Sequence, residues 1–129
     1  MQNDPLAACL AKLFNAERVG KKDVVVRPAS KMIKTILSIM NDHRYLGSFE
    51  ENKDDKGGWL TINLIGNINK CGVIKPRFSA KNTGYEKWEK RYLPAKDFGI
   101  LIVSTPQGIM THHHAKEKKL GGRLVAYCY

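Results

Sequence analysis

The chain has 129 residues, and its 22 Lys and Arg against 12 Asp and Glu give a formal net charge of +10. This charge predicts a polyanionic partner, because cationic side chains gain affinity by releasing counterions from phosphates. A hydrophobic content of 43% allows one domain or two small lobes with a modest core, so a disordered chain is not the expectation. No stretch reaches the roughly 18 apolar residues of a membrane span, and the start lacks the basic and apolar regions of a signal peptide, so nucleic acid is favoured over membrane.

Two helices are predicted in an N-terminal lobe over residues 1–66. Asp4 and Pro5 form a typical helix start, and apolar residues then recur at helical spacing over residues 6–14. Ser30 is a suitable cap for a second helix, whose apolar stripe runs over residues 32–40. These stripes are expected to face the core of the lobe.

Three strands are predicted to complete this lobe. A short strand is expected over residues 23–27, and residues 45–51 and 59–65 indicate a hairpin. In the last of these, Leu60, Ile62 and Leu64 alternate with polar residues, which is typical of a half-buried antiparallel strand. The N-terminal lobe therefore has the expected order α-β-α-β-β.

The C-terminal lobe, residues 67–129, is predicted to be a small antiparallel sheet with short helices, so the whole chain is expected to be an α+β protein of two small lobes. Residues 73–78 are expected to form an edge strand, because the internal Pro76 cannot donate a ladder hydrogen bond. Residues 79–84 suggest a basic loop, and residues 85–92 a short helix with its aromatic residues on one side.

The most informative stretch is a strand followed by a turn, residues 100–108. Ile100 to Val103 is an unbroken apolar run, which predicts a strand buried on both faces. In the segment Ser104–Gly108, Pro at the second turn position and Gly at the fourth fit a type I turn with two hydroxyls at its entrance. Such a turn suits close approach to a sugar-phosphate backbone, and an ordinary polar hairpin turn is the alternative.

The C-terminal end is predicted to contain one more helix and one more strand. Thr111 is expected to cap a helix through Lys119, and Gly121 is expected to take the left-handed conformation that follows a helix end. A strand over residues 123–129 then closes the lobe. Beyond these elements the sequence contains neither a chain-wide repeat nor a low-complexity tract.

Histidines and cysteines are the residues to weigh for chemistry. Consecutive helical residues point about 100° apart, so His112, His113 and His114 are not expected to share one metal, and a solvated cluster is favoured. A metal-dependent nucleic-acid-processing enzyme that uses these histidines is the alternative function. Cys9, Cys71 and Cys128 lack paired spacing and predict free thiols in a reducing cytoplasm. No catalytic motif, cofactor or metal site is indicated, so an enzyme is not expected.

Four motifs in order along the chain closely resemble small-subunit ribosomal protein eight. The stretch from Lys75 to Pro94 is similar to the archaeal and eukaryotic branch of this family, and it resembles the archaeal form most. The motifs are residues 4–6 with 15–19, residues 27–31, residues 98–108 and residues 121–127. The resemblance implies a ribosomal, cytoplasmic protein that binds small-subunit rRNA early in assembly, at an irregular stem of the central domain. It also implies that the two lobes are tightly joined, that the protein contacts neighbouring ribosomal proteins and that it is a monomer when free. Regulation of a messenger RNA through a similar stem is compatible with it.

The resemblance also implies which residues contact RNA. In the family a hydroxyl-rich loop enters the minor groove of the stem, and Ser104, Thr105 and Gly108 match it, whereas Pro106 replaces the usual hydroxyl residue. Thr105 is therefore expected to carry more of the recognition. The full set of expected RNA-binding residues is Ser104, Thr105, Pro106, Gln107, Gly108, Gly121, Gly122 and Arg123, with Arg27, Lys31, Lys75 and Arg77 as further candidates to neutralise phosphate.

Overall fold

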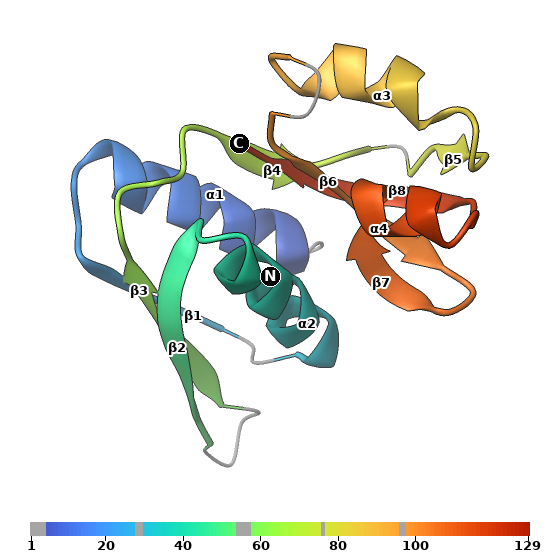
Figure 1. Ribbon diagram of the computed structural model, residues 1–129. Helices are drawn as coiled ribbons and strands as arrows, with labels where there is room; N and C mark the ends of the chain where they lie inside the picture. Colours follow the sequence, from blue (N-terminus) through green and yellow to red (C-terminus); the bar gives the residue numbers. More distant parts are fainter. Residues whose placement is uncertain (1–4, 28–29, 54–57, 76, 96–97) are drawn as a thin grey trace. The chain divides into compact units, whose positions relative to one another are not determined.

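Helices and antiparallel strands build an α+β fold, as the sequence predicts (Figure 1). The structure, a computed structural model, describes residues 5–27, 30–53, 58–75, 77–95 and 98–129. The chain divides into two units, Met1–Cys71 and Gly72–Tyr129, each of which is described by itself below. The sequence placed this boundary earlier, at residue 66. Among the described residues, no helix has both the length and the apolar character that crossing a membrane requires.

The first unit has the predicted order α-β-α-β-β. Its strands form an antiparallel sheet in the order β1-β3-β2, so that β3 is central. The elements are α1 (Pro5–Arg18), β1 (Asp23–Val26), α2 (Lys31–Asp42), β2 (Leu46–Asn52) and β3 (Trp59–Leu64).

One face of this sheet forms the core of the first unit. Leu60, Ile62 and Leu64 of β3 are buried, while the residues between them are more exposed, as the alternation predicts. The helices place their own buried stripes against that core, and Ser30 caps α2 by accepting a hydrogen bond from the Ile33 amide at 3.2 Å. The predicted cap at Asp4 lies outside the described residues.

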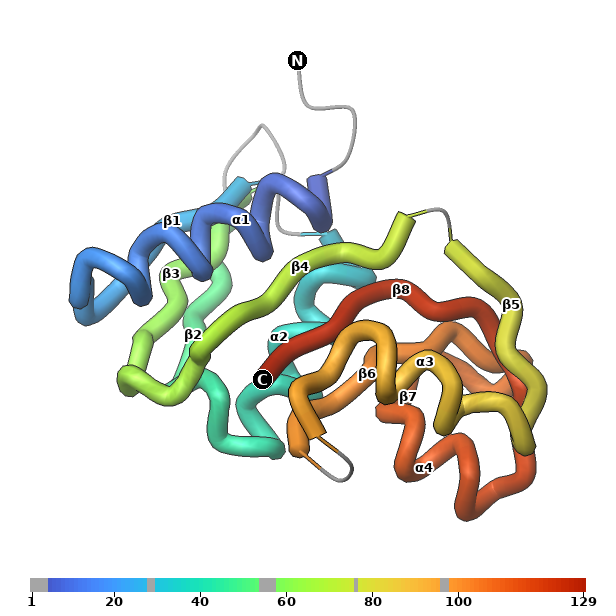
Figure 2. Tube along the Cα trace, turned by 90° about the horizontal axis from the view of Figure 1, so that it is seen from above, coloured from blue at the N-terminus to red at the C-terminus, as the bar shows by residue number. Residues whose placement is uncertain are grey.

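The second unit is a small antiparallel sheet with two helices among its described residues (Figures 1 and 2). Its strands run in the order β4-β8-β6-β7, and β5 also pairs with β8. The elements are β4 (Cys71–Val73), β5 (Ser79–Ala80), α3 (Tyr85–Tyr92), β6 (Ile100–Thr105), β7 (Gly108–Thr111), α4 (His112–Glu117) and β8 (Gly122–Cys128).

The strand β6 leads directly into the predicted turn and supports it. Its residues Ile100 to Val103 are each at most 3% exposed, which confirms burial on both faces. The apolar residues Leu101 and Val103 belong to a core cluster that also contains Tyr85 and Trp88 of α3 and Ala115 of α4. Both helices therefore cover the same face of the sheet.

Three elements in this unit differ from the predictions. The strand predicted over residues 73–78 is wrong: short strands β4 and β5 lie on either side of the stretch around Pro76, because a proline has no N–H for a ladder bond. The last helix ends at Glu117 instead of Lys119, and Lys119 itself takes the left-handed φ of 57° that Gly121 was expected to adopt. Residues 108–111, expected only as a connection, form β7.

Candidate nucleic-acid interface

The hairpin between β6 and β7 presents the predicted turn at its tip. Thr105 pairs with Gly108, so Pro106 and Gln107 form a two-residue loop, and both are exposed. The Thr105 hydroxyl donates to the Gly108 carbonyl at 2.7 Å and accepts from the Gln107 amide at 3.2 Å. Gly108 has a φ of +119°, a conformation that other residues rarely adopt. The Thr105 hydroxyl therefore holds the turn together.

An exposed row of polar side chains crosses the sheet beside this turn. In the strand register Ser104 of β6 pairs with Arg123 of β8, and Arg123 pairs with Ser79 of β5. Directly paired residues share a face, so these three exposed side chains form one row, which we call the Ser–Arg–Ser row. Strands lie about 4.8 Å apart, so the row spans roughly 10 Å. It unites two of the predicted residues, Ser104 and Arg123, with Ser79, which the sequence did not single out.

Gly121 and Gly122 allow the three strands to come this close. A Cβ on Gly122 would lie 2.3 Å from the Ser104 carbonyl oxygen, and one on Gly121 would lie 2.8 Å from the Ala80 carbonyl oxygen. Both distances are well below van der Waals contact. Gly121 and Gly122 therefore permit close strand packing beside the turn, and Gly121 does not take the left-handed conformation that was predicted for it.

The remaining predicted cations lie in both units. Lys75 and Arg77 are exposed in the segment between β4 and β5 of the second unit. Arg27 and Lys31 are exposed in the first unit, where the Arg27 guanidinium lies 4.7 Å from the centre of the Trp59 ring. All four side chains have the exposure that contact with phosphate requires.

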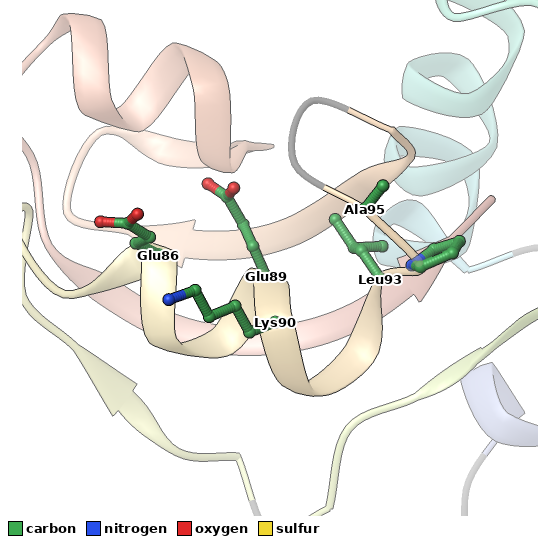
Figure 3. Close-up of a pocket in the computed structure, with 6 residues that line it drawn as sticks. Glu86, Glu89, Lys90, Leu93 and Ala95 are labelled. Carbon is green, nitrogen blue, oxygen red and sulfur yellow. The ribbon is translucent and has the colours of Figure 1, made fainter.

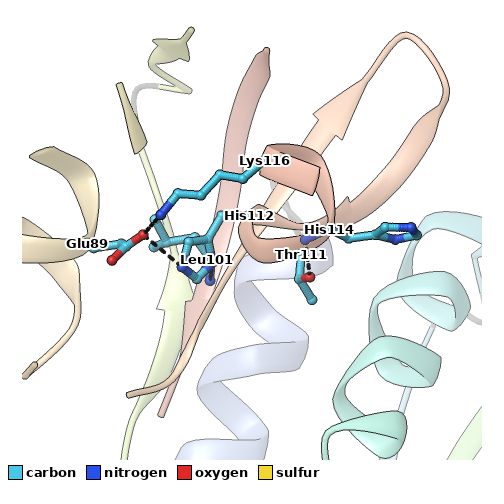
Figure 4. A network of polar contacts seen from close by, with 6 residues as sticks. All are labelled: Glu89, Leu101, Thr111, His112, His114 and Lys116. Atoms are coloured by element: carbon cyan, nitrogen blue, oxygen red, sulfur yellow. Dashed lines mark hydrogen bonds and ion pairs between the residues drawn. The ribbon is translucent and has the colours of Figure 1, made fainter. Parts of the chain in front are cut away.

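A buried polar network links α3, α4 and β6 (Figure 4), and no motif in the sequence indicated it. His112 is fully buried, which corrects the prediction of a solvated histidine cluster, and its Nδ1 accepts a hydrogen bond from the Leu101 amide at 3.0 Å. Its Nε2 lies 3.2 Å from Oε1 of Glu89, and Lys116 donates a hydrogen bond to the same oxygen. Glu89 is 3% exposed. Glu89 occupies the i+4 position after Tyr85, a helical spacing that signals its burial.

The pKa values of this network follow from burial and from charge. Burial, together with the positive charge of His113, lowers the pKa of His112 to about 4, so its ring is neutral at pH 7. Burial by itself would raise the pKa of Glu89, but the hydrogen bond from Lys116 and the nearby positive charges outweigh burial and lower that pKa. Glu89 is thus an anion that neutralises Lys116.

A hollow of about 200 Å³ lies beside the helix α3 (Figure 3). Glu86, Glu89 and Lys90 of α3 line it together with apolar Leu93 and Ala95. The exposed carboxylate of Glu86 lines this hollow and repels phosphate, so we do not include the hollow in the candidate interface. Within the described ranges, no three His, Cys, Asp or Glu side chains gather in a group that could hold a metal ion.

The geometry combines a hydroxyl-rich turn, a guanidinium between two serines and exposed cations, which is a set of donors suited to a phosphate and sugar backbone. Comparison of the sequence with models of protein families gives one match. Residues 4–129 match the family model described as ribosomal protein S8.

Proposed function

The chain belongs to the ribosomal protein S8 family, and we propose that within the small ribosomal subunit it is a primary binder of an irregular stem in the central domain of the rRNA. Family membership makes the protein a structural constituent of the small subunit that binds rRNA and ribosomal proteins. The S8 family is not an enzyme family. The proposal adds the identity of the RNA target, support of subunit assembly and a monomeric free state.

The Ser–Arg–Ser row beside the hairpin turn is the observation that carries this proposal. Duplex RNA hides its base edges in a deep groove, so proteins read distorted stems by their shape and 2′-hydroxyls. Ser104 supplies an exposed hydroxyl at the end of a strand that is buried on both faces, and Arg123 supplies a guanidinium for the adjacent phosphate. A rigid mount keeps these donors in place before RNA binds.

The proposed contacts divide into three groups. The first group approaches the stem and consists of Ser104, Pro106, Gln107 and Gly108. Thr105 keeps the turn closed, and Gly121 and Gly122 allow the strands to pack closely. Arg123 neutralises phosphate next to the turn. Arg27, Lys31, Lys75 and Arg77 contribute affinity that does not depend on sequence, since cations act on any phosphate within reach.

Replacing Ser104 by Ala tests the proposal directly. Because Ser104 is exposed, Ser104→Ala leaves the fold intact and removes one hydroxyl donor, which weakens binding to the central-domain stem by about 1 kcal/mol. The measurement is a filter-binding titration against this stem and against a regular duplex of equal length, which is expected to bind the parent protein at least about tenfold more weakly.

Ser38→Ala is the matched control, since Ser38 is an exposed serine on α2 of the first unit. Its affinity for the stem is expected to equal that of the parent protein. Equal affinity of the parent protein for the stem and for the regular duplex would contradict the proposal.

A further inference from the structure

Three aromatic rings surround the guanidinium of Arg91 on α3. Its central carbon lies 5.2 Å from the ring centre of Phe78, 5.6 Å from that of Trp88 and 5.6 Å from that of Tyr92. Phe78 and Trp88 stack on each other with centroids 4.7 Å apart. We call these three rings the aromatic platform. A guanidinium held on rings keeps its N–H donors available at its edge, so it is already ordered for a bidentate partner.

A second cation shares this platform. The Lys87 ammonium lies 5.0 Å from the ring centre of Trp88, four residues before Arg91 on the same helix. Like charges at this spacing repel each other. Neither side chain forms an ion pair with any described residue, whereas the nearby Lys116 is paired with Glu89. Among the residues that the structure describes, the pair therefore has no anion that would relieve its repulsion.

The surrounding segment is strongly basic. Residues 75–92 contain 6 Lys and Arg and 2 Glu, and one of the two, Glu89, is buried against Lys116. Trp88 is only 8% exposed, so a nucleotide base has no room to stack on it. Phe78 and Tyr92 are partly buried, whereas Lys87 and Arg91 are exposed, which fits contact with a phosphate backbone. A polyanion as dense as RNA matches this charge better than an acidic peptide does.

The aromatic platform and the Ser–Arg–Ser row lie on opposite faces of the sheet. Arg123 alternates with Leu124, and Ser104 with Val103, and both of these apolar residues belong to the core cluster that α3 covers. Ser79 likewise alternates with Phe78, whose ring stacks on α3. An RNA stem seated on the row therefore does not also cover Arg91.

We propose that Arg91 and Lys87, held on the aromatic platform, form a second RNA contact that binds the phosphate backbone of an rRNA segment outside the stem. The protein then connects two segments of the rRNA from the two faces of one sheet. This inference rests on the proposed function, because it takes the row as the site of the first segment.

Replacing Arg91 separates the two contacts. With whole small-subunit rRNA, Arg91→Ala is expected to weaken binding about three- to tenfold and to reduce the salt slope of log K by about 0.7 to 0.9. With the isolated stem its affinity is expected to equal that of the parent protein, which also shows that the variant is folded. Arg91→Lys is expected to recover only part of the loss, since an ammonium lacks the planar fork.

Lys90→Ala is the matched control. Lys90 carries the same charge on the same helix but lines the hollow beside Glu86. Its affinity for whole rRNA is expected to stay within about twofold of the parent. Loss of affinity in Arg91→Ala no greater than in Lys90→Ala would overturn the second contact. In that case a loss in Ser104→Ala still supports the stem contact, so the two proposals fail separately.

A tethered cleavage probe identifies the partner. The described cysteines Cys9, Cys71 and Cys128 are buried, and burial raises the pKa of Cys9 to about 11 and that of Cys71 to about 12, so a new surface thiol reacts selectively. A hydroxyl-radical reagent on Lys87→Cys is expected to cut an rRNA segment distinct from the one cut from Gln107→Cys. Cuts confined to the stem would overturn the proposal, as would a photocrosslink from position 87 to a protein in the assembled subunit.

Discussion

At the scale of single residues, two neighbouring hydroxyls of the turn have different surroundings. Ser104 is exposed, whereas Thr105 is 8% exposed and its hydroxyl bonds both sides of the turn. The sequence assigned more of the recognition to Thr105, and that assignment stays a prediction. The alternation of side chains along a strand explains the difference, because Thr105 points to the same face as Val103 and Ser104 to the opposite face.

Among the described glycines, Gly122 is the one where an added Cβ would come closest to another atom. A Cβ there meets the Ser104 carbonyl at 2.3 Å and Val103 Cγ1 at 2.9 Å, so Gly122→Ala must push β6 and β8 apart. The free energy of unfolding is expected to fall by about 2 to 3 kcal/mol, and binding to the stem is expected to weaken as well. Urea denaturation followed by circular dichroism measures the first effect.

Gly84→Ala is the control for Gly122→Ala, since its added Cβ would lie 3.6 Å from the nearest atom, the Lys81 carbonyl oxygen. Its cost is expected to stay under about 1 kcal/mol. If both variants unfold at the same urea concentration, close packing at Gly122 is not important for stability.

At the scale of secondary-structure elements, the buried network ties α3 and α4 to the sheet. Glu89 comes from α3, His112 and Lys116 come from α4, and the Leu101 amide comes from β6. The helix α4 has only 6 residues, which is too short to be stable by itself. Its side chains on the network and Thr111, which caps it by accepting from the His114 amide, hold it in place.

The network predicts a loss of stability in acid. The folded protein lowers the pKa of His112 from 6.5 to about 4, so between these values the unfolded chain binds more protons and the free energy of unfolding falls as pH decreases. The pKa of Glu89 is also lowered, so its contribution is lost in the same direction as pH falls through its folded pKa. From pH 7 to pH 4.5 we expect a loss on the order of 2 kcal/mol, measured by urea denaturation.

His112→Gln tests the source of this pH dependence. The amide oxygen can still accept from the Leu101 amide but does not titrate, so the decline between pH 7 and pH 4.5 is expected to become shallower. His114→Gln is the matched control, because His114 is exposed, and its pH profile is expected to match that of the parent protein. Parallel declines in all three proteins would show that another group is responsible.

At the scale of the whole molecule, the net charge of +10 dominates association with RNA. Each phosphate that a cation neutralises contributes about −0.7 to −0.9 to the slope of log K against log salt. With about five such contacts, affinity for rRNA is expected to fall on the order of 10²-fold between 50 and 200 mM salt. Titration at several salt concentrations measures the slope, and a slope near zero would contradict a phosphate-dominated interface.

Two variants test how much a single cation contributes to this salt slope. Arg123→Met is expected to make it shallower by about 0.7 to 0.9, because Arg123 is exposed in the Ser–Arg–Ser row. Lys34→Met is expected to leave it unchanged, because Lys34 is already paired with Glu51 at 3.0 Å. Equal slopes in Arg123→Met and the parent protein would remove Arg123 from the interface.

The sequence by itself determined the features that depend on neighbouring residues. The cap at Ser30, the helical stripes, the alternation in β3 and the doubly buried run at Ile100–Val103 all follow from periods of a few residues, and the order of four motifs identified the family. The strand over residues 73–78 was wrong because a local pattern does not show which residues find a ladder partner: Ile74 and Phe78 each form one backbone hydrogen bond with β8, while the strands β4 and β5 lie on either side of them.

Only the tertiary structure decided which distant residues meet. The register of β5, β6 and β8 sets Ser79, Arg123 and Ser104 in one row, the close approach of strands explains Gly122, and the packing of α3 against α4 buries Glu89 beside His112. Register and packing depend on contacts between segments far apart in sequence, and a shift by one residue would reverse the faces. The chemistry of the proposed RNA contacts is thus present in the composition, while their arrangement is a product of the sheet.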